Sequence, residues 1–65
     1  MIVVNGKPSE VTAGTTLAAV VAAMTATGSG VAVAVNDQVV PRGAWPTTRL
    51  GDGDRVEVLT AVQGG

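Results

Sequence analysis

The apolar and polar positions at the start of the chain predict a β-hairpin. A short β-branched run at residues 1–4 is followed by Asn5-Gly6, and both of these residues tolerate positive φ. A two-residue turn is therefore expected there, with the returning strand at about residues 8–12. The next break, Ala13-Gly14-Thr15-Thr16, ends that strand and supplies two threonines, either of which can cap a helix.

The helix is expected to begin directly after these threonines. Its larger apolar residues have the i, i+3, i+4, i+7 spacing of one buried face: Leu17, Val20, Val21 and Met24. Residues 25–30 are poor helix formers, and Gly28 is a reasonable C-terminal stop. The helix therefore ends before Val31.

The middle of the chain predicts two further strands and a loop. Residues 31–35 alternate large and small apolar side chains, which is typical of an interior strand. A turn at Asn36-Asp37 leads to a short strand at 38–40, which ends at Pro41 because proline has no N–H to donate. Residues 42–50 are interpreted as a loop that contains a single helical turn.

A final strand follows the turn Asp52-Gly53-Asp54, in which the aspartates are expected to bond backbone N–H groups and to serve neither catalysis nor a metal. Polar and apolar residues then alternate, so that Val56 and Val58 point inward. Leu59 falls on the outward face with Ala61 and Val62 near it, and these three residues are candidates for docking a partner.

The order of these elements is two strands, a helix, two strands and a last strand. It predicts an α+β protein of the β-grasp, ubiquitin-like order, with a mixed sheet of four to five strands and one main helix packed across one face. At 65 residues the chain is expected to form one domain, residues 1–65, with residues 61–65 as a flexible tail. Trp45 is expected to be a packing anchor and Arg42 to be solvated.

Composition removes several classes of function. Neither cysteine nor histidine is present, which argues against an autonomous enzyme and requires any sulfur chemistry to use the main chain. The net charge is −1, the four basic residues are scattered, and a single aromatic residue offers no stacking platform for nucleic acid. The longest apolar stretch, residues 17–24, is too short to cross a bilayer, and no secretory leader is evident. A cytoplasmic location is expected by default.

Several stretches, taken in order, resemble the ThiS family of sulfur carriers of thiamine biosynthesis. They are Val4-Asn5-Gly6, Ala13-Gly14-Thr15-Thr16, Ala34-Val35-Asn36, Val40-Pro41-Arg42 followed by Trp45, Asp52-Gly53-Asp54 with Val56-Glu57-Val58, and the last two residues, Gly64-Gly65. Each stretch alone is a weak signal. Their order and the chain length make a specific combination that covers the whole chain.

This resemblance implies a β-grasp fold and a chemical role for Gly65. Its carboxylate would be adenylated by an ATP-dependent enzyme of the ThiF type and converted to a thiocarboxylate with a sulfur donor system. The thiocarboxylate would deliver sulfur to a ThiG-type thiazole synthase. The carrier itself would bind no cofactor or metal, since ATP and magnesium would be used by the activating partner.

The two glycines suit this chemistry. A terminal carboxylate is ionised at neutral pH and is a poor acceptor for a sulfur nucleophile, so it must first be activated. Gly64 and Gly65 lack side chains that would block a narrow active-site channel. Five residues beyond Thr60 reach roughly 17 Å when extended.

Two other functions stay open. The first is a sulfur carrier for another pathway, such as molybdopterin or a different thiocarboxylate-dependent biosynthesis. The second is a ubiquitin-like interaction module whose tail is never activated, or one that is conjugated to lysine.

Overall fold

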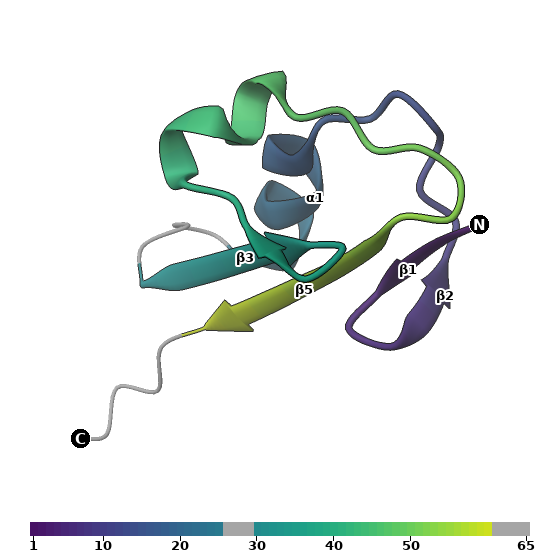
Figure 1. Ribbon diagram of the computed structural model, residues 1–65, viewed down its shortest axis with the longest axis horizontal. Coiled ribbons are helices and arrows are strands. Elements are labelled where there is room, and N and C mark those ends of the chain that lie inside the picture. Colours follow the sequence, from purple (N-terminus) through teal and green to yellow (C-terminus); the bar gives the residue numbers. More distant parts are fainter. Residues whose placement is uncertain (26–29, 61–65) are drawn as a thin grey trace.

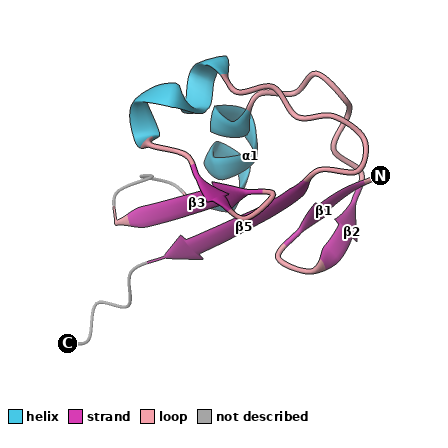
Figure 2. Cartoon of the chain, in the orientation of Figure 1, coloured by secondary structure: helices cyan, strands magenta, loops and turns pink. Residues whose placement is uncertain are grey.

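A mixed β-sheet with two helices on one side forms the framework of the protein (Figures 1 and 2). A computed structural model describes residues 1–25 and 30–60. In chain order the elements are β1 (Ile2–Val4), β2 (Lys7–Ser9), α1 (Leu17–Met24), β3 (Val31–Val35), β4 (Gln38–Val39), the 3₁₀-helix η1 (Arg42–Thr47) and β5 (Arg55–Thr60). The strands lie in the order β2-β1-β5-β3-β4, so the last strand is the central one and β3 is also interior, as predicted.

The first hairpin forms at the predicted turn, where Asn5 has a φ of 51° and Gly6 a φ of 79°. Its returning strand is shorter than predicted and spans Lys7–Ser9 instead of residues 8–12. The reason lies in the register. Ile2 is the first residue of β1 and pairs with Ser9, so later residues have no partner in β1.

The start of α1 confirms the predicted cap and identifies it as Thr16. The Thr16 hydroxyl accepts a hydrogen bond from the Ala19 N–H at 3.2 Å, which satisfies one of the free donors of the first turn. Leu17, Val20 and Val21 are buried as predicted.

The end of α1 differs from the prediction in one residue of the apolar face. Met24 is 47% exposed, because it is the last residue of the helix and the chain continues from it into the extended backbone of Thr25. The Thr25 N–H donates to the Val21 carbonyl and closes the last turn at 3.0 Å. Gly28, the predicted stop, lies outside the described residues.

The second hairpin and the segment after it lie close to where the sequence predicts them. β3 has the predicted bounds, and both turn residues adopt positive φ, 51° at Asn36 and 69° at Asp37. β4 ends one residue early because Pro41 begins η1 as its N-cap, although the Val40 N–H still donates to the Val33 carbonyl at 2.8 Å. The predicted helical turn in residues 42–50 is η1.

One hydrophobic core lies between the sheet and the helices. Its buried members are Ile2, Leu17, Val20, Val21, Val33, Trp45, Leu50, Val56 and Val58. Trp45 is 5% exposed and its indole N–H donates to the Val40 carbonyl at 2.9 Å, so it is the predicted packing anchor. The exposed Arg42 has its guanidinium carbon 6.0 Å from the centre of the Trp45 ring.

The cap geometry predicts different effects for the two neighbouring threonines. Thr16→Ala removes the acceptor for the Ala19 N–H and is expected to lower the free energy of unfolding by about 1 kcal/mol. Thr15→Ala is the matched control and should change it by less than about 0.5 kcal/mol. Urea denaturation followed by circular dichroism measures both, and equal losses would contradict the assignment of the cap to Thr16.

Candidate functional site

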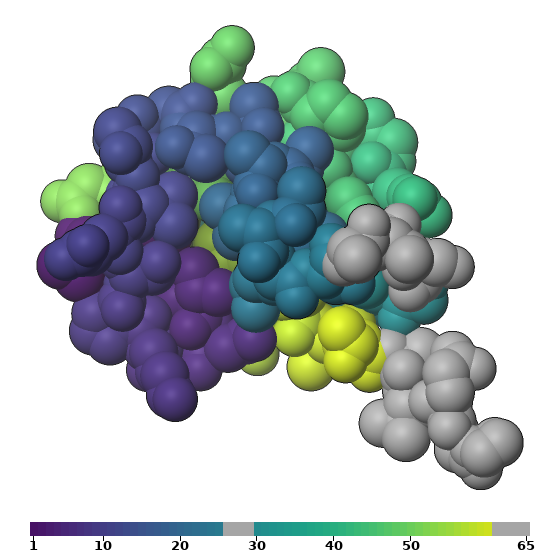
Figure 3. All heavy atoms as spheres, turned by 180° about the vertical axis from the view of Figure 1, so that it is seen from behind, coloured from purple at the N-terminus to yellow at the C-terminus, as the bar shows by residue number. Residues whose placement is uncertain are grey.

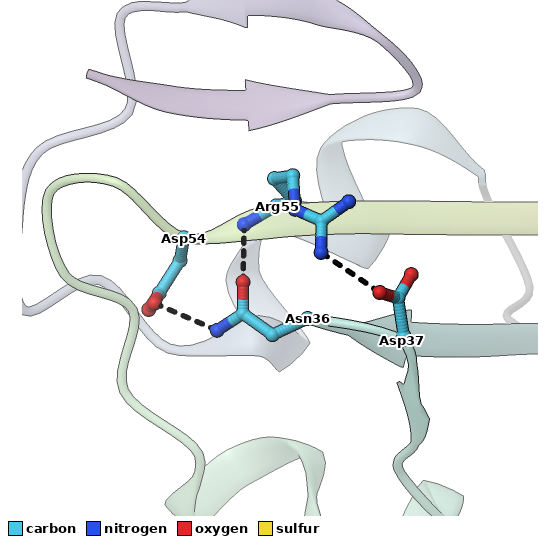
Figure 4. A network of polar contacts seen from close by, with 4 residues as sticks. All are labelled: Asn36, Asp37, Asp54 and Arg55. Atoms are coloured by element: carbon cyan, nitrogen blue, oxygen red, sulfur yellow. Dashed lines mark hydrogen bonds and ion pairs between the residues drawn. The ribbon is translucent and has the colours of Figure 1, made fainter.

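The start of β5 is held by a network of polar side chains from the β3–β4 turn (Figure 4). The amide oxygen of Asn36 accepts the Arg55 backbone N–H at 3.0 Å, and its amide nitrogen donates to Asp54 Oδ1 at 3.0 Å. The Arg55 guanidinium donates to Asp37 Oδ2 at 2.8 Å. This network joins the turn at residues 36–37 to the first residues of β5.

Asp54 also closes the turn that leads into β5. Its Oδ2 accepts the Gly51 N–H at 2.8 Å, and Gly53 supplies the positive φ of 92° that the turn needs. The hydrogen bond from the Gly51 backbone, followed by the one from the Asn36 side chain, holds the pKa of Asp54 below its ordinary value of 3.8. Asp52 instead forms an exposed ion pair with the amino group of Met1.

A second asparagine holds the middle of β5 from the opposite side. The Asn5 N–H donates to the Val56 carbonyl at 2.8 Å, and the Asn5 side-chain oxygen accepts the Val58 N–H at 2.8 Å. Both bonds come from the turn of the first hairpin, in which Asn5 has a positive φ. Strand β5 is therefore fixed on both sides before it reaches Leu59.

The face of the sheet opposite the helices carries an apolar patch at the end of β5. Leu59 is 66% exposed and pairs across the strands with Ala32, while Ala34 pairs with Val39, which is 78% exposed. Paired residues in neighbouring strands point to the same face, so these four side chains lie on one face, with the exposed Glu57 opposite Ala34 beside them. We call Ala32, Ala34, Val39 and Leu59 the outer patch. Its apolar side chains are thus bordered by a carboxylate within the same face.

Only part of the predicted site falls within the described residues. Leu59 is on the outward face, as the alternation in β5 predicts. Ala61, Val62, Gly64 and Gly65 lie outside the described residues, and their roles in docking and chemistry stay predictions.

The sequence pattern does not predict that Ala32, Ala34 and Val39 lie beside Leu59. The alternation of valine and alanine over residues 31–35 does indicate that one face of β3 is made of alanines. The strand register was needed to place these alanines beside Leu59 and Val39.

Next to the outer patch, β1 and β5 border a hollow of about 250 Å³. It is lined by Val3, Gly6, Arg55, Val56 and Glu57. Its volume lies below the roughly 300 Å³ at which pockets for small molecules begin, and its walls mix apolar and charged groups.

Within residues 1–25 and 30–60, no three His, Cys, Asp or Glu residues are grouped so that they could hold a metal ion. No helix in the same ranges is long and apolar enough to cross a membrane.

Comparison with known proteins gives a consistent result over the whole chain. The family model described as the ThiS family matches residues 2–65. The crystal structure of the thiamine biosynthesis protein ThiS from Geobacter metallireducens is 36% identical, with a TM-score of 0.81 and coverage of 98% of this chain and 97% of that one. An NMR solution structure of a thiamine biosynthesis protein from the same organism is also 36% identical, with a TM-score of 0.80 and coverage of 98% and 86%.

No curated protein matches the chain at a significant level. The likeness to the solved structures and the observed strand order together confirm the predicted α+β, β-grasp class.

The lowered pKa of Asp54 predicts how the stability of the protein depends on pH. Its carboxyl binds a proton less readily when folded than when unfolded, so its stabilising effect is present above pH 3.8 and is lost as pH falls through the folded pKa. Asp54→Asn is expected to lower the free energy of unfolding by about 1 kcal/mol near neutral pH. This difference from the wild type should shrink at about pH 3.

Urea denaturation at about pH 6 and pH 3 measures this effect. Glu10→Gln, which removes a negative charge from an exposed position, controls for the change in net charge. A difference between Asp54→Asn and wild type that stays the same at both pH values would contradict the role given to the Asp54 hydrogen bonds.

Proposed function

This chain belongs to the ThiS family, and from that premise we propose that it is a sulfur carrier of thiamine biosynthesis that acts through the carboxylate of Gly65. The observation that carries the proposal is the family match over residues 2–65, which extends through Gly64-Gly65. In this proposal the protein is the substrate of its partners and is not itself an enzyme. Those partners are a ThiF-type adenylyltransferase, a sulfur donor system and a ThiG-type thiazole synthase, all in the cytoplasm.

The proposed chemistry has two steps at one carbon atom. A carboxylate oxygen of Gly65 forms a bond to the α-phosphorus of ATP, and pyrophosphate leaves with the displaced electron pair. A sulfur nucleophile at the oxidation level of sulfide then forms a bond to the carbonyl carbon, and AMP leaves. The product is a thiocarboxylate, whose sulfur is a nucleophile for the next enzyme. ATP and magnesium are bound by the adenylyltransferase in this scheme.

The described part of the chain would supply recognition. The outer patch ends at Leu59, one residue before the end of β5 and six residues before Gly65. A partner that docks on this patch therefore has the reacting carboxylate within roughly 20 Å of the contact, as an upper limit set by the extended chain. This arrangement separates the surface that is recognised from the group that reacts.

Intact-mass spectrometry tests the proposed chemistry directly. After incubation with ATP, magnesium, the cognate adenylyltransferase and a sulfur donor, the protein should gain the mass difference between sulfur and oxygen, located at Gly65 by fragmentation. Deleting Gly65, or adding one residue after it, should abolish this gain without changing the circular dichroism spectrum. An unchanged mass of the wild type with active partner enzymes would refute the sulfur-carrier proposal.

The result would also separate the alternatives. A sulfur carrier for another pathway would gain the same mass but would not support thiazole formation with the thiazole synthase. A chain that is conjugated to lysine would appear as a covalent adduct of two proteins. An interaction module without an activated tail would show neither change.

A docking role for the outer patch predicts that Leu59→Gln slows adenylation. We expect kcat/KM for the adenylyltransferase to fall by about tenfold, because a large apolar side chain is removed from the contact. Met24→Gln is the matched control, since Met24 is also a large exposed apolar residue but lies on the helix. Its kcat/KM should stay within about twofold of the wild type.

Both variants should keep their free energy of unfolding within about 0.5 kcal/mol, because neither side chain is buried. Equal slowing by the two variants would show that the outer patch has no special part in recognition.

A further inference from the structure

Among residues 1–25 and 30–60, the second half of β5 pairs with a strand on one side and has no strand beside it on the other. On one side, β3 pairs with β5 along its length from Val56 to Thr60. On the other side, β1 pairs only with Arg55 and Val56 before the chain turns away. Figure 1 shows β5 running past the first hairpin toward its end, and in the space-filling view the yellow end of β5 lies at the surface near the purple hairpin (Figure 3).

The observed hydrogen bonds show which backbone groups of β5 face this open edge. The carbonyls of Asp54 and Val56 and the N–H of Val58 all point toward the first hairpin, where they bond Val3, Asn5 and the Asn5 side chain. Backbone groups of alternate residues point the same way along a strand. The Val58 carbonyl and the Thr60 N–H and carbonyl therefore point to this same edge, where no strand of residues 1–25 or 30–60 lies beside them.

The two outermost edges of the sheet are protected against pairing, whereas this edge is not. Strand β2 carries Lys7 and Pro8, a charge and a residue without an N–H. Strand β4 is two residues long and is followed closely by Pro41. In contrast, residues 58–60 are Val, Leu and Thr, which favour strands and carry no charge. An unprotected strand edge on a natural protein is a template for another strand.

We propose that the adenylyltransferase pairs an extended segment of its own main chain with the open edge of β5 at Val58 and Thr60. This inference rests on the proposed function, because that function requires the enzyme to hold Gly65, five residues beyond this edge. An enzyme that holds Gly65 is therefore bound to the chain within five residues of the end of β5. Strand addition supplies main-chain hydrogen bonds there, and the exposed Leu59 side chain between the two residues offers an apolar contact on the outer face.

Substitution of Thr60 tests the proposal with a matched pair of variants. Thr60→Pro removes the N–H that faces the open edge. The fold should tolerate it, because the Thr60 N–H does not point toward β3 and the preceding residue, Leu59, is already extended. Thr60→Ala removes the side chain and keeps the N–H. By isothermal titration calorimetry with the adenylyltransferase, Thr60→Pro is expected to weaken binding by about tenfold and Thr60→Ala by less than about twofold. Equal affinities of the two variants would overturn the proposal.

Amide hydrogen exchange of the wild type provides a second measurement that does not depend on the folding of a variant. The Thr60 amide should exchange rapidly in the free protein and at least about tenfold more slowly with the adenylyltransferase bound. The Leu59 amide, which faces β3, should be protected in both states. An exchange rate at Thr60 that does not change on binding would overturn the proposal. So would slow exchange in the absence of the enzyme that depends on protein concentration, because the edge would then pair with a second copy of the chain.

The outcomes also distinguish this inference from the proposed function. If the wild type gains sulfur at Gly65 but Thr60 shows no protection, the function stands and strand addition is wrong. If Thr60 is protected by the enzyme but no sulfur is gained, the pairing stands and the sulfur-carrier function fails.

Discussion

The pairing of β5 with β1 on one side and with β3 on the other organises the whole sheet. Five residue pairs join β3 to β5, and the parallel pairing with β1 brings residues 3–4 beside residues 55–56. These contacts connect parts of the chain that are distant in sequence, so the sheet is complete only when the last strand is in place. Val56, at the crossing of the two pairings, is fully buried. The last described strand is thus the one that joins the two halves of the sheet.

Two asparagines on opposite sides of β5 form the same pair of hydrogen bonds to this strand. Asn5 and Asn36 each occupy a hairpin turn with a φ of 51°, and the backbone N–H of each donates to a carbonyl of β5 at 2.8 Å. The side-chain oxygen of each then accepts an N–H of β5, from Val58 or Arg55. The side chain therefore continues the hydrogen bonding of the strand where the backbone of the hairpin turns away. A residue that only tolerated positive φ, such as glycine, would form the turn but would leave that N–H of β5 without this partner.

The sequence predicts the local part of this arrangement and misses the long-range part. The turns at Asn5-Gly6 and Asn36-Asp37 follow from residue preferences, as does the inward direction of Val56 and Val58. The bond from Asn5 to Val58 spans 53 positions and cannot be read from a local pattern. The same limit applies to the outer patch. Alternation exposes Leu59, but only the register of the strands adds the side chains of β3 and β4 to it.

Two smaller differences also have physical causes. Residue preferences predict a longer β2 than the structure has, because a strand extends only as far as its partner and β1 begins at Ile2. Helical spacing predicts that Met24 is buried, but it does not show that the helix ends at this residue, where the side chain is exposed.

The proposed reaction at a main-chain carboxylate would place an unusual demand on the fold. A catalytic side chain needs neighbours that tune its pKa and orientation, whereas a chain without cysteine or histidine that reacts at Gly65 can leave both tasks to its partner. What the described part must provide is a fixed starting point for the tail and a surface that the partner recognises. The hydrogen bonds of Asn5 and Asn36 provide the first and the outer patch suits the second. Under the proposed function both requirements would fall on β5, the strand that Asn5 and Asn36 hold at the centre of the sheet.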